Sequence, residues 1–154
     1  MGPEIISYIA LGFIIVIGFF IVRAAFKLHE KNYPLEDGEK KLYEESDVRF
    51  ETHLNGETTI RKVRVRITDR RLFIFSHGEY LYAVIYVDGR AADKTRDHLK
   101  GVEHIPRTSF KVEHHEKRNV DVLVVEHANI IGLPMRYTFF MAGVQDAAKA
   151  LGIV

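Results

Sequence analysis

Cysteine and tryptophan are both absent from this sequence of 154 residues. Without cysteine the chain can form no disulfide, thiolate metal site or cysteine nucleophile, although this absence does not identify a cellular compartment. Charge of one sign is not in excess either, because 22 basic side chains stand against 21 acidic ones and give a formal charge of +1. This balance gives no reason to expect DNA or RNA as a partner, and we therefore predict none.

The longest uncharged run lies near the N-terminus, between Ile5 and Val22. Its length of about 18 residues matches that of a membrane-spanning helix, and it lacks the polar stripe of a helix that packs on a globular core. A cleaved signal peptide is the alternative, but such a peptide has basic residues before its apolar run. The upstream charged side chain here is Glu4. We therefore predict an uncleaved transmembrane anchor in the lipid bilayer.

Three basic residues follow the apolar run, namely Arg23, Lys27 and Lys31. The positive-inside rule then places the rest of the chain in the cytoplasm, as in a single-pass protein of the cell membrane. We expect the anchor and a juxtamembrane helix to occupy residues 1–31, because the residue before Pro34 avoids helical geometry. Residues 32–46 carry charges of mixed sign together with Gly38, which predicts a linker.

Residues 47–154 form a domain that reads as a series of short strands. Side chains alternate over residues 48–54, and the Asn55-Gly56 pair that follows is a strong hairpin signal. The next strand ends at Ile67. Further strands are predicted over residues 72–76, 80–87, 110–115, 120–126 and 135–141, with a short helical turn within 91–99 and a final helix over 145–151. The segment 80–87 is apolar on both faces, so we expect both faces to be covered.

The run Ile67-Thr68-Asp69-Arg70-Arg71-Leu72-Phe73 resembles the second hairpin of GRAM and bacterial or archaeal pleckstrin-homology-like domains. The stretch His104-Ile105-Pro106 before Phe110 is similar to a later strand entry in that family, and the closing helix stands where a helix plugs the family's barrel. The resemblance implies a mainly β fold: a small, bent antiparallel barrel of about seven strands with a C-terminal α-helix. It also implies a binding function with no catalytic residues.

One face of the second predicted hairpin supplies the first candidate binding residues, which are Lys62, Arg64, Arg66, Arg70, Phe73 and Phe75. A two-residue turn at positions 69–70 places Arg64 opposite Phe75. The same register places Arg66 opposite Phe73. Guanidinium groups beside aromatic rings suit cation–π contacts and an anionic partner.

A simpler interpretation of this face stays open. Basic residues on alternate positions of a strand are common on solvated surfaces. In that case nearby acids such as Glu45, Asp47 and Glu51 neutralise the arginines, and a neighbouring segment shields the two phenylalanines.

The predicted loop before residue 135 supplies three further candidates, Ile130, Ile131 and Leu133. Large aliphatic side chains are unusual at the tip of a loop, which normally faces water. Such a tip could enter the bilayer or dock a partner. Alternatively, the preceding strand continues to Ile131 and these side chains belong to the core.

Eight histidines are spread along the chain, and His114 and His115 are adjacent. Adjacent residues of a strand point to opposite faces, so these two cannot share one metal ion. His114 could lie across from Asp121, but no serine or cysteine completes a nucleophilic set. The sequence also has no glycine-rich phosphate loop. We therefore expect no enzyme activity, no metal and no cofactor.

These observations predict a membrane-anchored cytoplasmic module that makes protein contacts at the membrane surface. Its partner would be a membrane-associated protein or a second copy of the chain. Binding of anionic lipid headgroups through the basic strand is the alternative, and an accessory subunit of a membrane enzyme complex is a more distant one.

Overall fold

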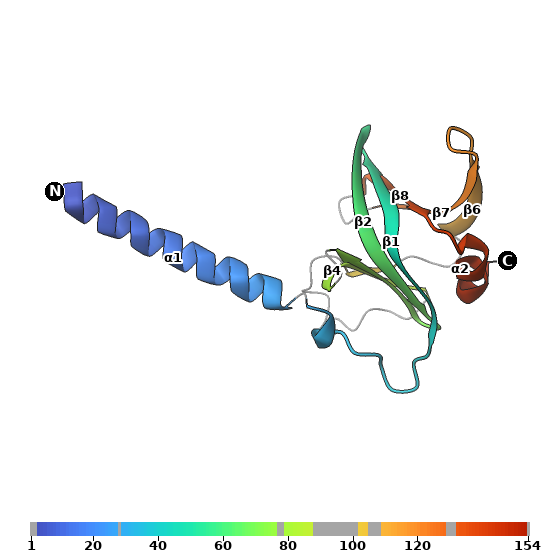
Figure 1. Ribbon diagram of the computed structural model, residues 1–154, viewed down its shortest axis with the longest axis horizontal. Helices are drawn as coiled ribbons and strands as arrows, with labels where there is room; N and C mark the ends of the chain where they lie inside the picture. Colours follow the sequence, from blue (N-terminus) through green and yellow to red (C-terminus); the bar gives the residue numbers. More distant parts are fainter. Residues whose placement is uncertain are drawn as a thin grey trace. The chain divides into compact units, whose positions relative to one another are not determined.

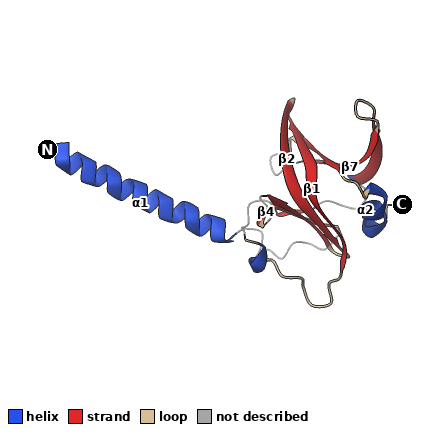
Figure 2. Cartoon of the chain, in the orientation of Figure 1, coloured by secondary structure: helices blue, strands red, loops and turns tan. Residues whose placement is uncertain are grey.

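A computed structural model of the chain describes residues 3–27, 29–76, 79–87, 102–104, 109–128 and 132–153. Two compact units divide the chain, Met1–Pro34 and Leu35–Val154. The first is helical, and the second is a sheet of strands with one helix (Figure 2).

The first unit consists of the helix α1 (Pro3–Lys27), drawn in blue in Figure 1, and a single 3-10 turn η1 (Glu30–Asn32). The stretch Ile6–Arg23 of α1 has a mean hydropathy of 2.3, and none of it is buried against the rest of the chain. Phe13, for example, is 69% exposed. A helix of 25 residues is about 38 Å long at 1.5 Å per residue, which exceeds the hydrocarbon thickness of about 30 Å. Its length and composition therefore suffice to cross a membrane.

The second unit is built on one sheet with the strand order β5-β4-β3-β2-β1-β8-β7-β6. The strands are β1 (Lys41–Leu54), β2 (Glu57–Thr68), β3 (Arg71–Ser76), β4 (Tyr80–Tyr86), β5 (Val102–His104), β6 (Phe110–His115), β7 (Val120–Ala128) and β8 (Pro134–Phe140). Neighbouring strands are antiparallel except for β5, which runs parallel to β4. Over the described ranges β5 and β6 are the two edges, so the sheet is open.

The mainly β fold and the C-terminal helix are confirmed, and the predicted strands lie at the expected places in the chain. Closure into a barrel is not seen in the part of the chain that the structure describes. The sequence pattern predicts no strand over residues 102–104, where β5 lies, although the family resemblance implies a strand entry that begins at His104. The expected helical turn within 91–99 lies outside the described residues, as do Ile105 and Pro106.

Strand β1 joins two halves of the sheet, β5-β4-β3-β2 on one side and β8-β7-β6 on the other, as Figure 1 shows. It pairs with β2 along most of its length, whereas its pairing with β8 begins only at Arg49. The register of β1 on β2 shifts between Glu45 and Val48, and Asp47 within this shift has a φ of 58°. A bulge of this kind bends a strand and increases its twist.

The beginning of β1 corrects the predicted linker at residues 32–46. The strand starts at Lys41, so residues 41–46 belong to the sheet. The mixed charges of this stretch suggested a solvated segment, but Glu44 pairs with Arg66 across the sheet and Tyr43 packs against the core. Charge in this stretch therefore reflects ion pairs within the folded unit.

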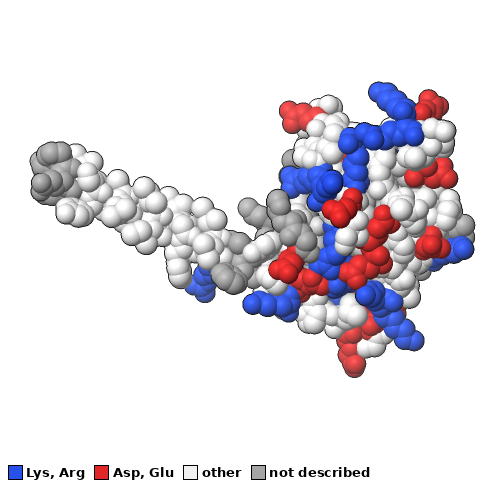
Figure 3. All heavy atoms as spheres, in the orientation of Figure 1, with Lys and Arg blue, Asp and Glu red and all other residues white. Residues whose placement is uncertain are grey.

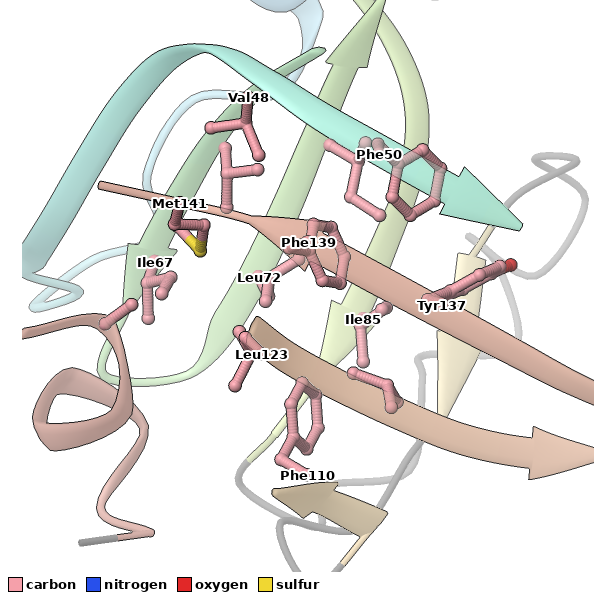
Figure 4. Close-up of a cluster of buried hydrophobic side chains, with 14 of the residues drawn as sticks. Val48, Phe50, Ile67, Leu72, Ile85, Phe110, Leu123, Tyr137, Phe139 and Met141 are labelled. Carbon is pink, nitrogen blue, oxygen red and sulfur yellow. The ribbon is translucent and has the colours of Figure 1, made fainter. Parts of the chain in front are cut away.

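The inner faces of both halves of the sheet contribute to one hydrophobic core (Figure 4). The ring centroid of Phe50 in β1 lies 4.8 Å from that of Phe139 and 5.3 Å from that of Tyr137, both in β8. Other side chains of this core come from most strands of the sheet: Val48, Val63, Val65, Ile67, Leu72, Ile74, Ile85, Phe110, Leu123, Val125 and Met141. Residues alternate between the faces of a strand, and alternation in the sequence accordingly located the core side chains of β1 and β2.

The helix α2 (Val144–Leu151) packs its apolar side chains into the same core and ends at Gly152, which has a φ of 68°. Its N-terminal end is held by Glu45 of β1. The Glu45 carboxylate accepts hydrogen bonds from the backbone N–H of Ala142 at 2.8 Å and of Gly143 at 3.2 Å, and also from the hydroxyl of Tyr43. An anion at the start of a helix is favourable, so the first half of β1 positions α2.

These contacts predict that the second unit needs residues before the bulge of β1 to be fully stable. A fragment 35–154 should unfold cooperatively in urea, monitored by circular dichroism. A fragment 47–154 lacks Glu39, Tyr43, Glu44 and Glu45, and its unfolding midpoint should be clearly lower because the ion pairs and the attachment of α2 are missing. Equal midpoints would show that the early half of β1 contributes nothing to stability.

Candidate functional site

The face of β2 and β3 that points away from the core has the predicted register. Arg64 pairs with Phe75, and Arg66 pairs with Phe73. The guanidinium carbon of Arg64 lies 4.4 Å from the centroid of the Phe75 ring, and that of Arg66 lies 5.4 Å from the same ring. The rings of Phe73 and Phe75 stack in parallel at 5.8 Å. Cation–π contacts therefore organise this face, as the sequence indicated.

Phe73 and Phe75 themselves are fully buried, each with 0% exposure. The prediction that they share an exposed binding face with the arginines is therefore wrong. Guanidinium groups lie over both rings, since Arg71 stacks on Phe73 at 4.6 Å. On the neighbouring strand β4, Leu81 and Val84 are buried as well, which agrees with the expectation that β4 is covered on both faces.

One carboxylate neutralises both arginines of this face. Glu44 Oε1 accepts hydrogen bonds from Arg64 at 2.6 Å and from Arg66 Nη2 at 2.9 Å, while its Oε2 accepts one from Lys41 at 2.9 Å. Burial favours the protonated form of Glu44, but these hydrogen bonds outweigh it and lower its pKa to about 2. The expected partners Glu45, Asp47 and Glu51 do not have this role.

A second carboxylate, that of Glu39, is buried beside the turn between β2 and β3. The side chains of Glu39 and Arg71 are 0% and 3% exposed. Arg71 Nε donates to Glu39 Oε1 at 2.9 Å, a second guanidinium N–H donates to Oε2, and the Thr68 hydroxyl donates to Oε1 at 2.5 Å. Burial raises the pKa of Glu39, but the hydrogen bonds from Arg71 and Thr68 more than compensate and lower it overall. The segment before β1 is thereby attached to the sheet.

The predicted basic residues do not form one site. Arg70 does not join Arg64 and Arg66. Its guanidinium donates to the carbonyl of Asp37 at 3.2 Å and pairs with Glu36 at 3.5 Å. Lys62 is exposed, and over the described ranges neither Lys62 nor its neighbour Arg61 forms an ion pair. Among the basic side chains of β2, these two are therefore available to a partner.

An open depression of about 640 Å³ lies around these two cations. Its lining consists of Ser46, Asp47, Ile60, Arg61, Lys62, Val63, Arg64 and Ser76. Ile60 is 52% exposed, which is unusual for a large aliphatic side chain on a strand. The depression therefore combines a basic and an apolar component on a single strand, β2.

A second cluster surrounds Phe140 at the end of β8 and was not found from the sequence. The guanidinium carbons of Arg49 and Arg118 lie 5.6 Å and 5.4 Å from its ring centroid, and the ring of His115 meets it edge-on at 5.0 Å. Arg49 is also paired with Glu51 at 2.7 Å. No local sequence signal connects these residues, because they come from β1, β6, the turn after β6 and β8.

The remaining candidates have separate outcomes. Leu133 is partly buried just before β8, whereas Ile130 and Ile131 lie outside the described residues, so the function of this loop stays a prediction. His114 lies across from Asp121, as expected, with 3.1 Å between Nδ1 and Oδ1. Within the portion of the chain that is described, no group of three or more His, Asp or Glu side chains could hold a metal ion.

Comparison with known proteins found no matching family model, no matching curated protein and no matching solved structure.

The buried pair predicts a large cost when one charge is left alone. Glu39→Ala should lower the free energy of unfolding by about 3 kcal/mol, because the buried Arg71 would lose the carboxylate that accepts its hydrogen bonds and keep the longer ion pair with Glu36 at 3.8 Å. Replacing both residues, as in E39A/R71M, should cost less than E39A by itself. Urea unfolding of fragment 35–154 measures both, with the exposed Glu116→Ala as the control. A double variant that is less stable than E39A would contradict this account.

The low pKa of Glu44 predicts a specific pH dependence. Because the pKa is lower in the folded protein than the ordinary value of 4.5, the stabilising contribution is fully present above pH 4.5 and is lost as the pH falls toward 2. Glu44→Gln lacks this contribution at every pH. The difference in thermal stability between wild type and E44Q should therefore be constant near neutral pH and shrink below pH 4.5. A difference that grows on acidification would contradict the assignment.

Proposed function

We propose that this chain is a single-pass protein of the cell membrane whose β domain lies in the cytoplasm and makes protein contacts at the membrane surface. The observation that carries the proposal is α1. Its stretch Ile6–Arg23 is apolar and exposed on all sides. Such a surface is unfavourable in water, and lipid tails cover it without the need for a buried face.

The orientation follows from charge beside α1. Arg23 closes the apolar stretch, and Lys27 and Lys31 follow within eight residues of it. Basic residues within this distance of a membrane span favour the cytoplasmic side. The sheet domain comes after these residues in the chain, so it belongs on the same side.

The tether between the two units is short. Residues 28–34 separate the end of α1 from the second unit, and a chain of this length spans at most about 25 Å even when extended. The buried Glu39–Arg71 pair keeps residues 35–40 from lengthening this tether. A domain with so short a connection stays near the membrane surface, which suits a module that contacts membrane-bound partners.

Protein contacts are favoured over lipid headgroups by the pairing of the basic residues. Headgroup binding usually rests on clusters of about four to eight Lys or Arg. Here Arg64 and Arg66 share Glu44, and Arg70 is held by Glu36. Figure 3 shows basic and acidic side chains interleaved over the visible face of the domain. Arg61 and Lys62 alone are a weak headgroup site.

Three measurements test this function. The full chain should stay in the membrane fraction after an alkaline wash, and crosslinking in intact cells should capture it in complexes with protein. Fragment 35–154 should bind vesicles of 30% phosphatidylserine weakly, and R64E/R66E should change that binding little.

The matched control is Lys111→Glu together with Arg136→Glu, which makes the same change of charge on another face. Tight, salt-sensitive binding of vesicles that R64E/R66E abolishes and this control does not would establish the lipid-headgroup alternative. Release of the full chain by the alkaline wash would refute the anchor.

A further inference from the structure

Half of β2 has a free edge. β2 runs from Glu57 to Thr68, but its pairing with β3 covers only Val63 to Ile67. Residues 57–62 pair with β1 on one side, and no strand of the described residues lies on the other. All six of these residues are exposed. Figure 1 shows the hairpin of β1 and β2 projecting beyond the shorter strands beside it. Unpaired N–H and C=O groups on such an edge can accept another strand.

We propose that this edge pairs with the same edge of a second copy of the chain, antiparallel, with Thr59 opposite Thr59 on a two-fold axis. The proposal rests on the proposed function, because it identifies the protein that the tethered module contacts. It continues the sheet from one copy into the other. Closed two-fold pairing of one surface with itself is the commonest form of homo-oligomer.

The charges of the edge are self-complementary in this register. With Thr59 on the axis, Glu57 of each copy stands opposite Arg61 of the other, so two Glu–Arg pairs form. Directly opposed side chains of an antiparallel pair lie on the same face and interact. Neither Glu57 nor Arg61 has an ion-pair partner within its own chain, over the described ranges. The guanidinium of Arg61 is already ordered over the ring of Tyr82, at 4.8 Å.

The end of β3 limits the register. Ser76, its last residue, pairs with Val63 and occupies the edge there, so an added strand has to stop at Lys62. In the proposed register Lys62 faces Gly56 of the second copy. The space in which a side chain at position 56 would lie is empty to 4 Å, which leaves room for Lys62. Ile60, 52% exposed, comes diagonally across from Ile60 of the second copy and gives an apolar contact near the axis.

The membrane explains how so short a contact can suffice. The paired segment, residues 56–62 of each copy, buries far less than the roughly 1,200 Å² of a stable interface in solution. Two anchored copies, however, meet at a high effective concentration. Basic residues on the edge also oppose indiscriminate pairing, so the Glu57–Arg61 match selects one register and one partner.

Disulfide crosslinking tests the register cleanly, because the chain has no cysteine of its own. Opposed residues of an antiparallel pair have Cα atoms about 4.5 to 5.5 Å apart, which a disulfide can bridge. In membranes that contain the full chain, Thr59→Cys should form a covalent dimer within minutes of mild oxidation with copper phenanthroline. Ile60→Cys should crosslink at least five-fold less, because its copies lie diagonally. Val120→Cys, exposed on β7, is the background control.

Charge reversal in the Thr59→Cys chain tests the pairing of Glu57 with Arg61. E57R and R61E should each lower the yield of dimer several-fold through like-charge contacts, and E57R/R61E should restore it. Lys62→Glu changes the same charge by the same amount opposite a glycine, so the yield should be retained.

Three results would overturn the proposal: a Thr59→Cys yield no higher than that of Val120→Cys, a higher yield for Ile60→Cys, or a double reversal that fails to restore the dimer. Retention of the chain in washed membranes, with other proteins crosslinked to it but no Thr59→Cys dimer, would refute the second copy and keep the proposed function.

Discussion

The bulge in β1 is the constraint on which the rest of the second unit depends. β1 is the only strand that pairs with both halves of the sheet, over the described ranges. At the bulge, with Asp47 at a φ of 58°, the strand bends, and the inner faces of both halves then contribute to one core. The half before the bulge carries the attachments: Glu44 holds the arginines of β2, and Glu45 holds the start of α2.

Ionic contacts decide which part of the surface is free. The outer face of β2 and β3 looks in sequence like a basic and aromatic binding face, yet Glu44 neutralises its arginines and the rings of Phe73 and Phe75 are buried beneath guanidinium groups. Stacked arginines cover the apolar rings while their guanidinium groups remain hydrogen-bonded to a carboxylate. Among the described residues, the tip of the β1–β2 hairpin remains open to a partner: residues 57–62 of β2 pair with β1 but not with β3, and the side chains of Glu57, Arg61 and Lys62 form no ion pair there.

The two proposals, a membrane anchor in α1 and self-pairing of the β2 edge, support each other physically. A short contact between two strand edges is weak in solution, and charged residues keep such edges from aggregating. In the function proposed above, an apolar helix and a tether of seven residues between α1 and the second unit confine the domain to the membrane and raise its local concentration. The proposed contacts between strand edges would then form at the membrane and not in solution.

The sequence by itself determined the elements whose physical signals are local. Hydropathy located α1, alternation located the core side chains of β1 and β2, and Asn55-Gly56 located the first hairpin. The register of β2 on β3 also followed from a local turn, Asp69-Arg70. Tertiary structure decided what those signals cannot carry, because a side chain's partner depends on segments distant in sequence. Whether Phe75 is exposed, whether Glu39 is solvated and whether β1 begins at residue 41 or 47 were settled by contacts with β2, β3 and α2. Charge in a sequence shows neither burial nor pairing. The sequence therefore could not reveal that Phe73 and Phe75 are buried and that Arg64 and Arg66 are paired with Glu44.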